Sequence, residues 1–331
     1  MIRTGAALLA LPALLGSAAN APQNQKAELV EVRMIWGRAP HNGFTDLVRF
    51  HDRWYCAFRE GRENLSPDGS LRVLTSADGG VWRSAALLSV AGTDLRDPKL
   101  SVTPHGRLLL NAGAALQGSP GVTHRSLVWS SADAREWSEP VSAGDPDVWL
   151  WRVTWHLKQA YSVGYGTRGT PSIRLYTSAD GSTFSAHSDN LADAGESREA
   201  SLLFMPDGRA LCLLRRGGAA STAVLGKSRA PYRGWSWTGL KVGIAGANLI
   251  RLPDERIVVS GRMIGADVHT SLAWLDPEAE TLTELLTLPS GGDSGYPGMV
   301  FHDGLLWVSY YSSHEGRAMI YLAKVKLPRK P

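Results

Sequence analysis

Short apolar runs separated by tight turns occur along nearly the whole chain. The pattern SLLFMP-DGR-ALCLLRR in 201–216 returns as NLIRLP-DER-IVVSGRM in 248–263 and as GMVFH-DGL-LWVSYY in 298–311. Short runs that are apolar or alternate with period two, bounded by Gly, Pro and Asp, are typical of strands joined in hairpins. No pattern with the helical period persists, so the sequence predicts an all-β protein.

A short motif, Ser-x-Asp-x-x-x-aromatic, recurs along the chain. TSADGGVW, SSADAREW and TSADGSTF begin at residues 75, 130 and 177, and a worn fourth copy, KSRAPYRGWSW, covers 227–237. A period near 50 with strand-like sequence between the copies is typical of a propeller. The spacing predicts one domain, residues 22–331, built as a six-bladed β-propeller of four-stranded antiparallel blades. The short Asp side chain should cap backbone N–H groups in a turn, so the motif serves the fold.

The first 21 residues are typical of a signal peptide. Arg3 gives a positive start, 6–15 is apolar, and small residues around Ala19 and Ala21 provide cleavage positions. The apolar run is too short to span a bilayer. We therefore expect an exported protein, secreted or periplasmic, with no membrane span.

Composition narrows the classes of partner. The formal net charge is +4, and no Lys/Arg run stands out before the last few residues, so we expect no nucleic-acid partner. We also expect a monomer. Neither metal-binding nor phosphate-loop motifs occur, and we expect no metal and no cofactor. Cys56 and Cys212 fall on opposite predicted blades, far beyond the ~7 Å that a disulfide allows, which predicts two buried free thiols.

Three arginines take the same position when the predicted blades are aligned on their hairpin turns. Arg59, Arg215 and Arg262 each end a second strand, where strands crowd around one mouth of a propeller. A guanidinium cluster there would bind a carboxylate, because arginine grips both oxygens at once. The alternative is that each arginine pairs with a neighbouring acid such as Glu60 and only covers the surface.

Further polar residues fall close to the same mouth. Glu199, Asp97 and Tyr296 stand near the starts of inner strands, while His314 and Glu315 follow the second strand of the last blade. Tyr296 could instead be a packing aromatic, and His314 a structural histidine. Together they form a candidate site of acids, arginines and one phenol.

The repeated motif resembles the Asp boxes of the sialidase superfamily, whose fold is a six-bladed propeller. The resemblance implies a tyrosine nucleophile assisted by a glutamate, an arginine triad for the substrate carboxylate and an aspartic general acid. By position it assigns Tyr296 as nucleophile, Glu199 as its base, and Arg215 and Arg262 to the triad. A neutral phenol would not repel a carboxylate beside the reacting carbon, as a carboxylate nucleophile would.

Two parts of the family pattern are altered. The first arginine of the family lies in R-I-P-x-L at the start of blade one, where this chain reads HNGFTDL; an R-x-P-x-L string opens blade two instead, at Arg96. Either Arg59 or Arg96 could complete the triad. The general acid is also open: Asp68, in ENLSPDGS, lies in the matching region but could simply form a turn, and Asp97 and Glu63 are rivals.

The leading hypothesis is an exported exo-glycoside hydrolase of sialidase type that removes a terminal acidic sugar with retention. Its partner would be an acidic glycan or glycoconjugate. The altered arginine pattern motivates a second hypothesis, a hydrolase or lyase for another uronate-type glycan. The third is a carbohydrate-binding propeller without catalysis.

Overall fold

The structure is a computed structural model, and it describes residues 1, 26–119, 121–168, 172–188, 190–192, 197–217 and 222–330. The expected signal peptide, from residue 2 onward, lies outside the described residues, as do its cleavage positions at Ala19 and Ala21. Export therefore stays a prediction.

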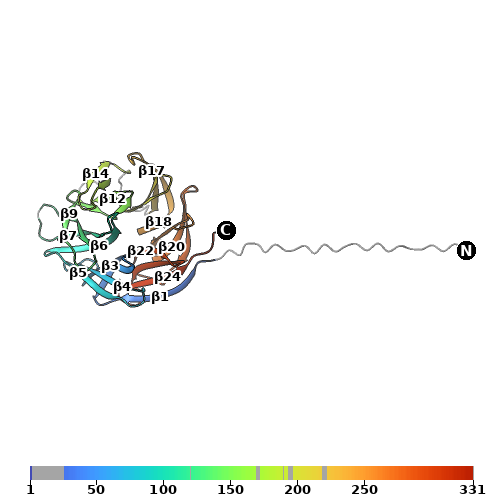
Figure 1. The fold of residues 1–331 in the computed structure, drawn as a ribbon, viewed down its shortest axis with the longest axis horizontal. Coiled ribbons are helices and arrows are strands. Elements are labelled where there is room, and N and C mark those ends of the chain that lie inside the picture. Colours follow the sequence, from blue (N-terminus) through green and yellow to red (C-terminus); the bar gives the residue numbers. More distant parts are fainter. Residues whose placement is uncertain are drawn as a thin grey trace.

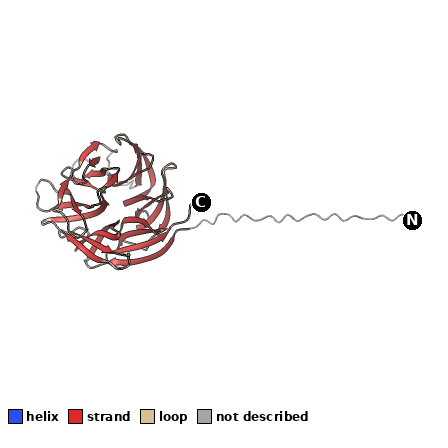
Figure 2. Ribbon diagram, viewed as in Figure 1, coloured by secondary structure: helices blue, strands red, loops and turns tan. Residues whose placement is uncertain are grey.

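Every regular element in these ranges is a β-strand, and all strand pairs are antiparallel (Figure 2). Three sheets follow one another along the chain: β2 (His41–Phe50), β3 (Arg53–Gly61), β4 (Ser70–Ser76) and β5 (Arg83–Leu88); β6 (Thr93–Val102), β7 (Leu108–Leu116), β8 (His124–Ser131) and β9 (Val141–Ala143); β10 (Val148–Leu150), β11 (Thr154–His156), β12 (Gln159–Gly166), β13 (Ile173–Ser178) and β14 (Ser185–Ser188).

The fourth sheet has seven strands: β15 (Ser197–Phe204), β16 (Arg209–Arg216), β17 (Thr222–Arg229), β18 (Ser236–Arg251), β19 (Ile257–Ile264), β20 (His269–Asp276) and β21 (Thr281–Thr287). It is continuous because the 16-residue β18 pairs with β17 through its first half and with β19 through its second half. The sequence predicted separate four-stranded units here.

The last sheet joins the two ends of the described domain. It holds β22 (Ser294–His302), β23 (Leu305–Ser312), β24 (Met319–Lys326) and, at its edge, β1 (Glu28–Trp36). The sheets lie around a common centre, and the chain colours follow one another around it (Figure 1). The architecture is all-β and propeller-like, built largely from four-stranded antiparallel sheets.

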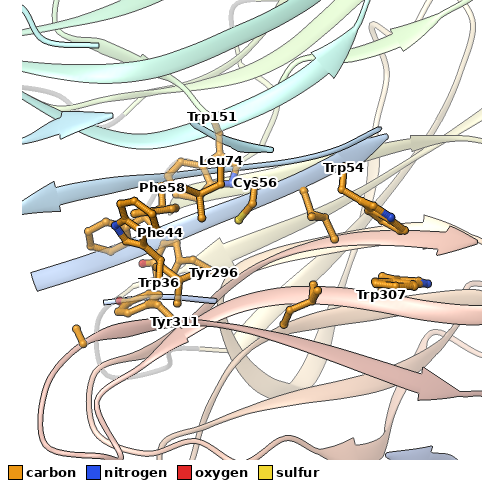
Figure 3. Packing of buried hydrophobic residues seen from close by; sticks show 14 of the residues in the cluster. Trp36, Phe44, Trp54, Cys56, Phe58, Leu74, Trp151, Tyr296, Trp307 and Tyr311 are labelled. Atoms are coloured by element: carbon orange, nitrogen blue, oxygen red, sulfur yellow. The ribbon is translucent and has the colours of Figure 1, made fainter. Parts of the chain in front are cut away.

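Apolar clusters fill the space between neighbouring sheets. Trp54 on β3 stacks on Trp307 of β23 with ring centroids 4.3 Å apart, and Figure 3 shows this pair at one end of a larger cluster. Burial of such large rings is a main source of stability in a β-protein. Cys56 and Cys212 are both buried and unpaired, which confirms the predicted free thiols.

The repeated motif forms the turn between the last two strands of each of the first three sheets. In the first copy, Ser76 Oγ accepts the N–H of Gly79 at 2.9 Å and Asp78 Oδ1 accepts the N–H of Gly80 at 2.8 Å. The copies at 130–137 and 177–184 make the equivalent bonds. This confirms that the motif caps turns. The worn copy keeps one contact, since Trp235 Nε1 donates to a carbonyl three residues earlier, as Trp82 does.

The inner strands share an irregularity that shapes the centre of the molecule. The pairings of β2, β6, β15, β18 and β22 with their neighbours all contain a register shift near the start of the inner strand. At four of these bulges a residue takes a left-handed backbone conformation: Phe44 (φ 64°), Asp97 (φ 51°), Gly246 (φ 57°) and Tyr296 (φ 52°). Such strained positions in non-glycine residues concentrate at functional sites, and bulges redirect side chains.

Two features are absent from the described residues. No helix there is long and apolar enough to cross a membrane. No group of three or more His, Cys, Asp and Glu side chains there could hold a metal ion.

Candidate active site

A tyrosine, a glutamate and an arginine meet at the centre of the molecule. Tyr296 Oη donates to Glu199 Oε1 at 2.8 Å, and Arg215 Nη1 lies 2.7 and 2.8 Å from the two oxygens of that carboxylate. The backbone N–H of Gly246 donates to the second oxygen at 3.3 Å. These contacts hold the carboxylate of Glu199 in place beside the phenol, where it can accept the phenol's proton.

The local backbone and three neighbours fix the Tyr296 ring. It stands in the bulge of β22, and Phe44 and Trp151 pack edge-on against it with centroids 5.1 and 5.9 Å away. Gly246 passes so close that an added Cβ would lie 2.5 Å from the ring. Burial, followed by the charge of Glu199, raises the pKa of Tyr296 well above its usual range, so the phenol is neutral at rest.

A second phenol lies beside the first (Figure 3). Tyr311 Oη donates to Asp293 Oδ1 at 2.6 Å, and Arg262 Nη2 lies 2.7 Å from the same carboxylate oxygen and 2.6 Å from the phenol. The Arg262 guanidinium also lies over the Tyr296 ring, 5.2 Å from its centroid. Arg262 therefore borders the nucleophile candidate but already has an acidic partner.

Asp293 is contacted by side chains from four separate segments of the chain. Its Oδ2 lies 3.0 Å from His41 Nε2 and accepts from Asn64 Nδ2 at 2.9 Å, in addition to the contacts with Tyr311 and Arg262. Burial opposes ionisation, but the hydrogen bonds from His41 and Tyr311 and the charge of Arg262 outweigh it. They hold the pKa of Asp293 well below its usual range.

Arg59 lies away from this cluster, contrary to its expected place in an anion clamp. Its side chain is fully buried; Nε donates to Asp94 at 2.8 Å, and both terminal nitrogens donate to the loop between β3 and β4, at Glu63 O and Ser66 O. All of its nitrogens are used inside the protein. Arg59 therefore holds the 62–69 loop in place. This role is close to the alternative stated above, in which each arginine pairs with an acid of the protein.

Arg96 is nearer to the centre. Its guanidinium lies 5.0 Å from the centroid of the Phe44 ring, and it contacts Asp94 Oδ2 at 3.2 Å and Asn64 Oδ1 at 3.1 Å. The Phe44 ring in turn packs on both Tyr296 and Tyr311. Of the two arginines that could replace the missing one, Arg96 borders the cluster through Phe44.

The two aspartates considered as general acid differ in environment. Asp68 lies on the exposed loop and accepts the N–H of Arg62 at 3.2 Å; a bond from Ser66 and that N–H lower its pKa. Asp97 occupies the bulge of β6, and its Oδ1 is buried without a hydrogen-bond partner among the described residues. Burial raises the pKa of Asp97. A general acid must carry a proton near neutral pH, which favours Asp97. Glu63 is exposed.

His314 and Glu315 lie on the exposed turn after β23. His314 Nδ1 lies 2.9 Å from Ser312 Oγ, and Glu315 Oε2 accepts from Tyr321 Oη at 2.6 Å. Among the described residues, neither side chain contacts Tyr296 or Tyr311. The structure therefore does not bring these two residues to the proposed centre.

The sequence reasoning missed four residues of the site: His41, Lys99, Asp293 and Tyr311. Lys99 is buried, with its ammonium 4.9 Å from the Trp151 ring centroid; burial lowers its pKa to about 8. Asp293 and Tyr311 flank Tyr296 in the sequence, and His41 opens the HNGFTDL segment. The signal available in the sequence was that these residues lie in or near segments that already contained predicted site residues.

Comparisons with known proteins identify the fold and no family. No family model matches the chain, and no curated protein matches it. A protein of unknown function from Dyadobacter fermentans has a similar structure, with 20% sequence identity and a TM-score of 0.81, covering 92% of this chain and 100% of that one.

Two glycosidases are also similar in structure. A Trypanosoma rangeli sialidase in complex with sialic acid shares 12% identity at a TM-score of 0.69, covering 86% of this chain and 54% of that one. An α-L-arabinofuranosidase from Fusarium graminearum, in complex with an iminosugar inhibitor, shares 13% identity at a TM-score of 0.68, covering 91% and 98%. This chain spans about half of the sialidase, and at such identities the likeness concerns the fold alone.

Proposed function

We propose that this protein is a glycoside hydrolase that removes a terminal acidic sugar with retention, with Tyr296 as its nucleophile. The observation that carries the proposal is the 2.8 Å contact between Tyr296 Oη and Glu199 Oε1 at the centre of the sheets. The sialidase and the arabinofuranosidase that share the fold support the class of reaction. They leave its substrate open.

The contacts define a two-step mechanism. Tyr296 Oη attacks the reacting carbon of the sugar while Glu199 takes its proton, and the bond from that carbon to the leaving oxygen breaks. Asp97, whose pKa is raised by burial in its bulge, supplies the proton for the leaving group. Water then attacks the same carbon and gives a proton to the Asp97 carboxylate, while the phenolate leaves and takes its proton back from Glu199. Two inversions at one carbon give retention.

Arg215 is proposed to attract the acidic substrate and to stabilise the negative charge that develops during the reaction. Its Nε is buried and has no hydrogen-bond partner among the described residues, although Nη1 is bound to Glu199. A fixed cation beside the reacting atoms stabilises negative charge that develops on the phenol oxygen. Its positive charge also attracts an anionic group of the sugar.

The proposal includes the finer features of the architecture. We assign six blades by dividing the seven-stranded sheet at β18, whose two halves pair with different neighbours. The worn turn motif between β17 and β18 supports this division. Export to the periplasm or medium and action as a monomer complete the proposal, and rest on the sequence.

The nucleophile can be tested by trapping. Incubation with a fluorinated uronic acid glycoside that carries a good leaving group should add one sugar to the intact protein, and peptide mass spectrometry should place it on Tyr296. The initial product should have the same anomeric configuration as the substrate, seen by proton NMR. Product of opposite configuration, or a sugar on another residue, would refute the mechanism.

A further inference from the structure

Arg262, whose guanidinium lies over the Tyr296 ring, is already paired with Asp293. From this we infer, on the basis of the proposed function, that the sugar bound here carries hydrogen rather than a carboxylate on its reacting carbon. Its acidic group lies elsewhere on the ring, as in a uronic acid. Asp293 takes the place that a carboxylate on the reacting carbon would need.

Asp293 and Tyr296 both contact Arg262. Its Nη2 lies 2.7 Å from Asp293 Oδ1, and its guanidinium lies 5.2 Å from the centroid of the Tyr296 ring. A carboxylate on the carbon that Tyr296 attacks would meet this guanidinium. Such a substrate carboxylate would lie close to Asp293, because Asp293 already binds Nη2 of the same guanidinium. Two carboxylates this close repel each other.

Asp293 is an anion that the protein holds firmly. Four side chains contact its carboxylate, namely His41, Asn64, Arg262 and Tyr311. They come from β2, the 62–69 loop, β19 and β23, so removing the carboxylate from the site would require several segments to move. The lowered pKa of Asp293 agrees with a carboxylate that stays ionised at neutral pH.

The missing first arginine could not be supplied from β2. If the Leu of R-I-P-x-L is placed on Leu47, the arginine position falls on Gly43. A Cβ at Gly43 would lie 2.9 Å from the His41 ring and 3.2 Å from the Tyr311 ring. The rings of His41 and Tyr311 therefore fill the direction in which an arginine from β2 would extend.

The same cluster offers groups that suit a sugar hydroxyl. The Asp293 side chain is 30% exposed, so it can still accept a hydrogen bond from a ligand. His41 Nδ1 is buried and has no hydrogen-bond partner among the described residues. A hydroxyl next to the reacting carbon can donate to Asp293, whereas a carboxylate there cannot.

Arg215 is the second cation beside Tyr296: its Nη1 is bound to Glu199 and lies 3.5 Å from Tyr296 Oη. Its positive charge attracts a carboxylate that lies away from the reacting carbon. A neutral phenol remains suitable for such an anionic sugar, because it adds no negative charge before Glu199 takes its proton. The inference thus names the substrate class without changing the mechanism.

The test compares two aryl glycosides that share one leaving group. The full-length protein should cleave the umbelliferyl glucuronide with a kcat/KM at least about 100-fold above that of the umbelliferyl N-acetylneuraminide. Equal or faster cleavage of the N-acetylneuraminide would overturn the inference and leave the proposed hydrolase standing.

Calorimetry separates this inference from the hydrolase proposal, because it needs no turnover. Free glucuronic acid should bind more tightly than free N-acetylneuraminic acid, even to a protein that cleaves neither glycoside. Tighter binding of N-acetylneuraminic acid overturns the inference in every case.

One substitution tests Asp293 directly. Asp293→Asn should lower the preference for the glucuronide by at least about 10-fold, since it removes the repulsion. The matched control is Asp303→Asn, which makes the same charge change at the exposed turn between β22 and β23 and should keep the wild-type preference. An unchanged preference in Asp293→Asn overturns the role of Asp293.

Discussion

Two tyrosine–carboxylate pairs lie side by side in this protein, and they differ in the backbone conformation and the burial of the tyrosine. Tyr296 and Tyr311 each donate to an acid, at 2.8 and 2.6 Å, and each packs against Phe44. Tyr296 stands in a strained bulge, while Tyr311 occupies a regular position on β23 and is fully buried. In the proposed mechanism the Tyr296–Glu199 pair reacts, whereas the Tyr311–Asp293 pair holds Asp293 in place.

The largest expected effect separates the two phenols. Tyr296→Phe removes the nucleophile and should lower kcat by at least about 1000-fold, whereas Tyr311→Phe leaves it in place and should cost less than about 10-fold. Steady-state rates with a fluorogenic uronide measure both, and circular dichroism checks that both variants fold. Similar losses in the two variants would remove the distinction.

The glycines behind the two phenols extend the comparison. Gly246→Ala would place a methyl group against the Tyr296 ring at a residue with φ 57°, and should lower kcat by about 100-fold because the nucleophile is displaced. Gly43→Ala presses on His41 and Tyr311 instead, and should change kcat less than about 5-fold. The same kinetic assay ranks them, and the opposite order would contradict our assignment.

The holding role of Asp293 predicts a pH-dependent effect on stability. Its pKa is lower in the folded protein than in the unfolded chain, so its stabilisation is present above the unfolded pKa and is lost as the pH falls through the folded pKa. Asp293→Asn should lower the free energy of unfolding by about 2 kcal/mol at pH 7. The difference should shrink below about pH 4 in urea titrations. A difference that is constant with pH would show that ionisation is not its source.

The smallest effect concerns Asp68. Because its carboxyl is exposed and its pKa is lowered, Asp68→Asn should change kcat less than about 3-fold with a glycoside whose leaving group is poor. Asp97→Asn should lose about 100-fold with that substrate and much less with an activated one. If Asp68→Asn instead showed this dependence on the leaving group, the general acid would be Asp68.

The sequence allowed prediction of features that depend on local pattern. Alternating runs located the strands, and the Ser-x-Asp motif located three turns that the hydrogen bonds confirm. Equal distances from the hairpin turns brought Arg215 and Arg262 to the same region. Glu199 and Tyr296 were found by their places at the starts of inner strands, and the structure joins them.

The rest depends on contacts between distant segments, which no local pattern encodes. Asp293 meets residues 252 and 229 positions away, at His41 and Asn64, and these partners decide that it is ionised and fixed. Arg59 shares a strand position with Arg262, but a loop of its own sheet and Asp94 take up its nitrogens. Equal strand positions therefore did not imply equal roles.

The pairing of β1 with β24 has a practical consequence for protein engineering. Glu28 lies opposite Lys326, so the first and last strands of the described domain are immediate neighbours in one sheet. A short linker could join these two points, and new ends could be opened at an exposed hairpin such as 302–305. In such a circular permutant every strand would keep its partners, and the tyrosine centre could be fused to other modules from a new side.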